Sequence, residues 1–271
     1  MAGLDFPGGN HEIRVEVIRR LNDSDAYHSR FRSVFSGLGE SDITYDMLAA
    51  ALAEFQISLT LANAPIDRFA RGQNKSMSKD LKKGALLFFG KANCVSCHSV
   101  SGHSNEMFSD FTTHVLAVPQ ISPIITNAAF DGPHQNEDFG LEQVTGNPQD
   151  RYKFRSSPLR NVGLQPSFFH NGAFTKLEDA IQHHLDVARS VREYRPSKHV
   201  APDLAGPTGP MSPVLAKLDP QMRKPTKLSH EEFHQLVAFV RFGLLDERSL
   251  MLDSLIPGEL ISGQLPLEFE D

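Results

Sequence analysis

The sequence predicts an all-α protein whose helices are joined by long loops. Three observations support this fold class. Apolar residues recur at helical spacing in several segments, two later segments open with capping boxes, and alternating strand patterns are sparse. Stretches rich in proline and glycine separate the helical segments, which is typical of loops and turns.

The first expected helices lie near the N-terminus. Ile13, Val17 and Leu21 recur at helical spacing. The run MLAAALAEFQISL is the clearest amphipathic helix of the chain, because its large apolar residues fall on one stripe: Leu48, Leu52, Phe55 and Leu59. Another helix is expected after Ser78, a suitable N-cap, with one stripe formed by Leu81, Ala85, Phe88 and Phe89.

The second half of the chain begins with a loop-rich stretch from about residue 99 to 174, where Asn, Asp, Gly and Pro are frequent. Thr175 and Glu178 form a capping box that predicts a helix over LEDAIQHHLDVA. Ser229 and Glu232 predict another over EEFHQLVAFVRFG, closed by Gly243. The segment between these helices reads as a surface loop.

The composition excludes some classes of function. A net charge of −6 argues against a general nucleic-acid binder, which would carry a basic patch. No window approaches the ~18 consecutive apolar residues that a membrane span requires. The first 21 residues lack the basic start, apolar core and small-residue cleavage site of a secretory signal.

The run KKGALLFFGKANCVSCHS contains Cys94 and Cys97, which are the two cysteines of the chain, followed directly by His98. Four interpretations of this Cys-x-x-Cys pair compete. A thioredoxin-like pair should follow a strand, whereas the preceding residues predict a helix. A zinc site would need a second cysteine or histidine pair at suitable spacing, and a fortuitous pair leaves the adjacent histidine unexplained.

Covalent haem is the interpretation that the motif favours. The two thiols of Cys94 and Cys97 would add to the vinyl groups of the porphyrin, and His98 would ligate the iron. One helical turn presents both sulfurs to one edge of the porphyrin, so the next imidazole points at the metal. The sequence therefore predicts one covalent haem c.

Four stretches resemble the C-terminal haem domain of the bacterial di-haem cytochrome c peroxidases and their MauG-like relatives. They are AAALAEFQISLTLANAPIDRFARG, KKGALLFFGKANCVSCHS, VTGNPQDRYKFRSSPLRNVGLQPSFFHNGAFTKLEDAIQHHL and LSHEEFHQLVAFVRFGL. The resemblance covers nearly the whole chain and implies an all-α, cytochrome c-like haem domain with long loops.

The chain departs from this family in one respect. Family members carry two Cys-x-x-Cys-His motifs, one in each cytochrome domain, and this chain has one. The first haem domain is therefore expected to be missing, as in a fragment, which would also account for the absent signal peptide. We expect residues 1–70 to form an N-terminal helical segment that packs on the haem domain, as a remnant of the inter-domain region. Residues 71–271 would form the haem domain itself.

The iron needs a sixth ligand. Downstream candidates are Met107, His114, His134, His170, His183, His184, Met211 and Met222. His184 lies on the apolar stripe of its expected helix, whereas His183 points about 100° away. A lone histidine on such a stripe is more often a core residue than a ligand. The resemblance favours ligation, because the distal ligand of this domain lies fourteen positions after the histidine of FHNG, which is His170. That position is His184.

The resemblance also implies a function. This chain would hold the electron-transferring haem domain, which takes electrons from a small donor protein, a cytochrome c or a cupredoxin, and relays them to a peroxide-reducing haem. It implies a periplasmic location, hydrogen peroxide as substrate of the intact protein, and a calcium ion between the two domains near LQPS. Catalytic residues are not assigned. The alternative is a stand-alone mono-haem electron-transfer cytochrome without peroxidase activity.

Two further motifs have competing interpretations. Arg155 and Arg160 would pair with haem propionates, or lie at the surface as solvated side chains. The run HEEFH matches the zinc-protease signature, with His230 and His234 as ligands and Glu231 as general base. A protease is the remote alternative, because Ser229 and Glu232 already account for the segment as a capping box.

Overall fold

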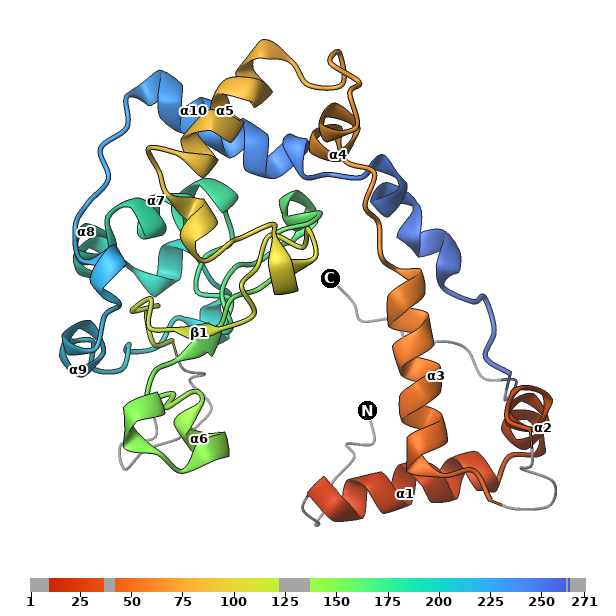
Figure 1. The fold of residues 1–271 in the computed structure, drawn as a ribbon. Coiled ribbons are helices and arrows are strands. Elements are labelled where there is room, and N and C mark those ends of the chain that lie inside the picture. Colours follow the sequence, from red (N-terminus) through yellow and green to blue (C-terminus); the bar gives the residue numbers. More distant parts are fainter. Residues whose placement is uncertain (1–9, 37–41, 122–136, 262, 264–271) are drawn as a thin grey trace. The chain divides into compact units, whose positions relative to one another are not determined.

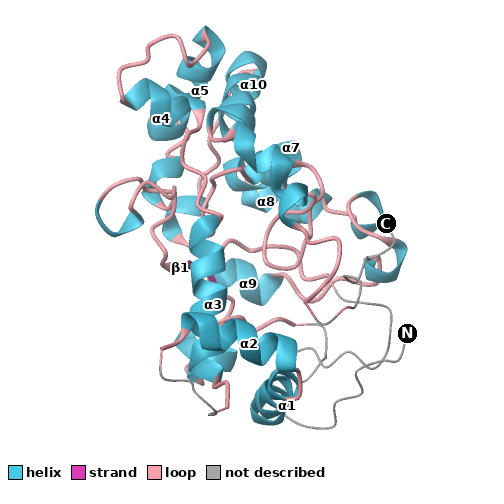
Figure 2. Cartoon of the chain, turned by 90° about the vertical axis from the view of Figure 1, so that its right-hand side faces the viewer, coloured by secondary structure: helices cyan, strands magenta, loops and turns pink. Residues whose placement is uncertain are grey.

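A computed structural model describes residues 10–36, 42–121, 137–261 and 263. Helices and loops make up nearly all of this part of the chain, with one pair of two-residue strands (Figures 1 and 2). The all-α prediction is confirmed. The chain forms two compact units, residues 1–61 with 250–271 and residues 62–249.

The first unit contains α1 (Asn10–Asn22), α2 (Asp25–Val34) and α3 (Tyr45–Ser58). The sequence predicts α1 and α3, whereas α2 was not predicted. The Asn22 side chain exchanges two hydrogen bonds with the backbone of Ile43 at 2.7 and 3.0 Å, which fixes the segment before α3 to the end of α1. Thr44 caps α3, since its hydroxyl accepts from the Met47 amide at 3.3 Å. Large apolar side chains of α3, such as Phe55, remain about half exposed (54%).

The second unit begins at Ala62 and so includes α4 (Pro65–Ala70). The Asp67 carboxylate accepts a hydrogen bond from the Ala64 amide at 2.8 Å and closes the first turn of this helix. The sequence places a domain boundary at residue 70, and this stays a prediction. The contacts within the chain group residues 62–70 with the second unit.

Helices α5 (Lys79–Phe89) and α10 (His230–Ala238) pack against each other in the second unit, where they lie side by side at the top of the view in Figure 1. Gly84 allows their backbones to touch, because a Cβ atom there would lie 2.0 Å from the carbonyl oxygen of Gln235. Ser78 caps α5 as predicted. The buried stripe of α5 includes Gly84, Leu87 and Phe88. Phe89, which was expected on the stripe, is 38% exposed.

The expected capping box of α10 is confirmed. The Ser229 hydroxyl accepts from the Glu232 amide, and the Glu232 carboxylate accepts from the Ser229 amide. The helix continues into a π-helical turn, Phe239–Gly243. The main apolar core lies around these two helices and comprises Met77, Leu87, Phe88, Phe108, Leu177, Leu236, Phe239, Val240 and Leu244.

Short elements and loops complete the second unit: α6 (Glu142–Thr145), α7 (Leu177–Leu185), α8 (Val187–Glu193) and α9 (Ser212–Ala216). Strands β1 (Thr113–His114) and β2 (Phe154–Arg155) pair antiparallel and join two parts of the loop-rich stretch. The capping box expected at Thr175 is wrong. Lys176 occupies the N-cap of α7, and Glu178 pairs with Arg241 at 2.9 Å instead of reaching back to the cap.

Candidate functional site

The Cys-x-x-Cys-His motif follows α5 directly and lines a cavity. Asn93, in the left-handed conformation (φ 51°), turns the chain into a 3-10 turn, Cys94–Ser96. The His98 amide donates to the Cys94 carbonyl at 2.9 Å, so the three motif residues occupy one turn. Both cysteines are free thiols. Burial raises the pKa of the Cys94 thiol to about 12.

The cavity has a volume of about 680 Å³ and mostly apolar walls. It lies within the second unit, between the motif, α7, α10 and the loops around β2. Both cysteines and His98 line one part of it, and His184 on α7 lines another. A volume in the usual range of cofactor pockets, about 300–1,000 Å³, suits a group as large as a porphyrin.

His98 is oriented by a backbone carbonyl. Its Nδ1 donates to the carbonyl oxygen of Phe108 at 2.9 Å, which leaves Nε2 as the acceptor nitrogen of a neutral ring. Burial lowers the pKa of His98 to about 4, so the ring is neutral at physiological pH. A neutral imidazole with one nitrogen held by a carbonyl is the form that ligates metals.

His184 is oriented in the same way. Its Nδ1 donates to the Ala180 carbonyl at 2.8 Å, one turn earlier in α7, and burial lowers its pKa as well. The ring stacks on Phe169 at a centroid distance of 5.2 Å and an angle of 15°. Its centroid lies 6.4 Å from that of His98, with the ring planes at 61°.

This spacing can be compared with that of two axial imidazoles. A ring nitrogen binds a first-row metal at about 2.0 Å, and the ring centre lies about 1.2 Å behind it, so two trans ligands have centres about 6.4 Å apart. The distance of 6.4 Å between the His98 and His184 rings agrees with that value. The residues present therefore fit a haem iron between them.

His183, the neighbouring candidate, has both ring nitrogens engaged. Nδ1 lies 2.9 Å from the Ser190 hydroxyl, and Nε2 lies 2.9 Å from the Leu116 carbonyl. As the sequence predicts, it points away from the stripe of His184. It is nevertheless fully buried (0% exposed), because the segment around Leu116 covers that side of α7.

The other candidates have different surroundings. His114 is held between two carboxylates, and His170 stacks on Phe154 at 3.4 Å with Asp138 at 3.5 Å. Met222, like His114 and His170, lines the cavity. Met107 and Met211 are not among the described residues that line it, and His134 lies outside the described residues.

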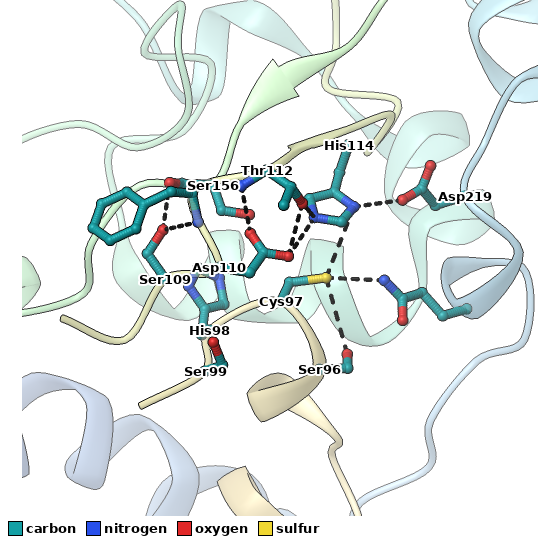
Figure 3. Close-up of polar contacts among 12 residues, drawn as sticks. Ser96, Cys97, His98, Ser99, Ser109, Asp110, Thr112, His114, Ser156 and Asp219 are labelled. Atoms are coloured by element: carbon teal, nitrogen blue, oxygen red, sulfur yellow. Dashed lines mark hydrogen bonds and ion pairs between the residues drawn. The ribbon is translucent and has the colours of Figure 1, made fainter. Parts of the chain in front are cut away.

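A polar network that the sequence did not predict surrounds Cys97 (Figure 3). When protonated, His114 donates from Nε2 to the Asp110 carboxylate at 2.8 Å and from Nδ1 to the Asp219 carboxylate at 2.7 Å, and its Nδ1 lies 4.0 Å from the Cys97 sulfur. The Gln221 amide also donates to this sulfur at 2.9 Å. Ligand atoms of Cys97, Asp110 and His114 all lie within 4.8 Å of one another. Asp219 is more than 100 residues away along the chain, so no local pattern could have indicated it.

The two arginines of the FRSSPLRNV segment line the cavity but differ in their contacts. Arg160 is buried, and its guanidinium makes a two-point ion pair with Asp67 at 2.8 and 2.9 Å. It is thus neither a solvated side chain nor a free partner for a propionate. Arg155 lies over the Phe111 ring at 5.4 Å.

The HEEFH segment lies in the first turns of α10. Its Glu231 accepts from Lys83 at 3.0 Å and from Gln235 at 2.8 Å, so the carboxylate does not serve as a base beside the two histidines. The comparisons below do not favour the protease interpretation.

Comparison with known proteins identifies the relatives of this chain. The family model for di-haem cytochrome c peroxidase matches residues 7–75. A cytochrome-c peroxidase, IdrP1, of Pseudomonas sp. (strain SCT) is 27% identical over 93% of this chain and 62% of its own length. The methylamine utilization protein MauG of Methylorubrum extorquens is 29% identical over 62% of this chain and 42% of its own length. The chain thus spans less than two thirds of these relatives.

Solved structures show the same fold. A MauG-like protein associated with microbial copper homeostasis superposes with a TM-score of 0.59 at 24% identity, over 89% of this chain and 64% of that protein. The diheme peroxidase BthA of Burkholderia thailandensis superposes with a TM-score of 0.56 at 19% identity, over 92% of this chain and 62% of that protein. The prediction of a cytochrome c-like fold is confirmed. Among the described residues, no helix combines the length and apolarity needed to cross a membrane.

Proposed function

Because this chain is a relative of the di-haem cytochrome c peroxidases and MauG proteins, we propose that it binds one haem c. Cys94 and Cys97 would anchor it covalently, and His98 and His184 would hold its iron. The spacing of the two rings, 6.4 Å between centroids, is the observation that carries the proposal. When bound, the haem supplies one-electron redox chemistry.

The residues of the chain prepare both ligands for this role. Burial lowers the pKa of each ring, so no proton competes with the metal at neutral pH. Hydrogen bonds to the carbonyls of Phe108 and Ala180 fix the tautomer and orientation of each ring and leave Nε2 free to bind. The apolar walls of the cavity exclude water from the group between them.

Two filled axial positions favour electron transfer over peroxide binding. The domain therefore takes electrons from a small periplasmic donor, a cytochrome c or a cupredoxin, and relays them to a second haem that reduces hydrogen peroxide. A calcium ion near Leu164–Ser167 belongs to the intact two-domain protein in this proposal. The alternative, a stand-alone electron-transfer cytochrome without peroxidase activity, is not favoured, because relatives of this chain are named cytochrome-c peroxidases.

The first test concerns attachment. The chain is expressed with a periplasmic leader and haem-attachment machinery, and pigment that survives acid–acetone extraction is measured. Covalent pigment is expected in the parent chain and in Ser96→Ala, a matched variant inside the same turn. It is expected to be lost when Cys94→Ala and Cys97→Ala are combined, and its persistence there would contradict the proposal.

The second test concerns the ligand on α7. His184→Ala is expected to convert a low-spin spectrum into a high-spin one that binds cyanide. His183→Gln, the matched control, keeps a polar group between Ser190 and Leu116 and should leave the spectrum low-spin. A spin change in His183→Gln, or none in His184→Ala, would show that another residue completes the iron.

A further inference from the structure

The two histidines of the HEEFH segment remain unused by the proposed haem site. His230 and His234 are one turn apart on α10, and both side chains are exposed. Their Nε2 atoms lie 3.0 Å apart, and the ring centroids are 4.2 Å apart with the planes at 70°. The Nε2 atoms of the two exposed rings thus face each other at hydrogen-bond distance.

The distance between the ring centres distinguishes two explanations for the short separation of the Nε2 atoms: a hydrogen bond between the rings, or an arrangement suited to one bound ion. A linear N–H···N hydrogen bond of this length would place the ring centres about 5.3 Å apart, because each centre lies about 1.2 Å behind its nitrogen. Two nitrogens bound at right angles to one ion, each about 2.0 Å away, lie about 2.8 Å apart and have ring centres about 4.5 Å apart. The observed ring-centre distance of 4.2 Å is nearer to the second value than to the first, and the nitrogens lie 3.0 Å apart, slightly farther than two ligands at a right angle.

From this geometry we propose that His230 and His234 form a surface site for a divalent transition metal ion, with Cu²⁺ as the preferred ion. Cis nitrogens at a right angle suit the tetragonal geometry of Cu²⁺, which also leads the Irving–Williams order. Water would complete the coordination, since the site lies at the surface. The site is independent of the haem cavity and of the proposed electron transfer.

The surrounding charges permit a cation here. Lys83 is neutralised by Glu231 at 3.0 Å, and Lys91 by Glu232 at 2.7 Å. The capping box holds the first turn of α10, so the spacing of the two histidines does not depend on the metal. Because Glu231 is engaged by Lys83, the site lacks the base of a zinc protease and is expected to bind the ion without hydrolysing peptides.

The test titrates the haem-loaded 271-residue chain, in which Cys97 is no longer a free thiol, with Cu²⁺ in a buffer that does not chelate it, and follows binding by calorimetry and electron paramagnetic resonance. One equivalent is expected, with hyperfine splitting from two nitrogens. His230→Ala and His234→Ala should each weaken binding about 100-fold, because the second nitrogen of a chelate acts at high effective concentration. His103→Ala, which removes another exposed histidine, should bind as the parent does.

Two results would overturn the inference: no stoichiometric Cu²⁺ binding by the parent chain, or unchanged binding in both His230→Ala and His234→Ala. Folding of each variant is checked by circular dichroism. Haem attachment is read separately from its visible absorbance, so failure of this site and failure of the proposed function are distinguishable.

Discussion

Arg160 and Asp67 form the ion pair whose removal should cost the second unit most. Their side chains are 5% and 7% exposed, and two N–H groups of the guanidinium reach the two carboxylate oxygens at 2.8 and 2.9 Å. The Nε of Arg160 also donates to the Glu106 carbonyl at 2.9 Å. The pair therefore connects α4 to the loops that form the cavity, and it is almost fully removed from water.

Replacing Arg160 with methionine keeps much of the side-chain volume but leaves the Asp67 charge buried. Breaking such a pair by removing one partner costs about 3–5 kcal/mol of unfolding free energy. The hydrogen bond from Ala64 remains and offsets part of this cost. We expect Arg160→Met to lose about 3 kcal/mol, measured by urea unfolding at pH 7, which corresponds to roughly 1–2 M in the midpoint.

Arg19→Met is the control, because Arg19 pairs with Glu16 on an exposed helix surface and is 56% exposed. Its loss should be below about 1 kcal/mol. A double-mutant cycle of Arg160→Met with Asp67→Asn should give a coupling energy of about 1–3 kcal/mol. If Arg160→Met costs no more than Arg19→Met, the pair is solvated, and Arg160 would be available to carboxylates in the cavity.

Three further predictions concern packing, pH and turnover. Gly84→Ala should destabilise the chain by about 1–3 kcal/mol, because its methyl group would meet the Gln235 carbonyl at 2.0 Å, whereas Gly258→Ala, which meets nothing within 4 Å, should be neutral in thermal unfolding. The Arg248 guanidinium holds the pKa of Asp246 at about 2, below its unfolded value, so this carboxylate contributes stability above about pH 4 that is lost as the pH falls towards 2. Asp246→Asn should therefore reduce the loss of unfolding free energy between about pH 4 and pH 2 by up to about 2 kcal/mol. An unchanged loss over this range would refute the linkage. Peroxide reduction by the haem-loaded chain should not exceed that of free haem in a donor-oxidation assay, and rapid turnover would mean that the distal ligand leaves easily.

Local patterns were sufficient for five of the ten described α-helices, namely α1, α3, α5, α7 and α10. Helical periodicity and the N-caps Ser78 and Ser229 predict α5 and α10, because a side chain that caps a helix acts within three residues of its own position. The same rule failed at Thr175. There Glu178 has a competing partner in Arg241, which is distant in sequence and is brought close by the fold.

In the candidate site, too, local sequence patterns predict some residues and miss the contacts between residues that are distant in sequence. Cys94, Cys97 and His98 are contiguous, and the helical offset distinguishes His184 from His183. The burial of His183 could not be predicted. The single apolar stripe of α7 predicts that only the side of the helix that carries His184 is covered, whereas the structure also covers the side that carries His183. Contacts such as Arg160 with Asp67 join residues 93 positions apart, and a single sequence carries no record of such pairing.

His183 and His184 carry the same side chain, so which of them binds the iron depends on the relative populations of two rotational positions of α7. A rotation of α7 by one residue, about 100°, would bring His183 to the cavity and remove it from Ser190 and Leu116. Each buried polar group left without a partner costs about 1–3 kcal/mol. Two such groups, on Ser190 and Leu116, would cost about 2–6 kcal/mol together. The rotated form would then make up between about one molecule in thirty and one in twenty thousand. Ligand selection in this helix thus depends on the hydrogen bonds that His183 makes with the Ser190 hydroxyl and the Leu116 carbonyl.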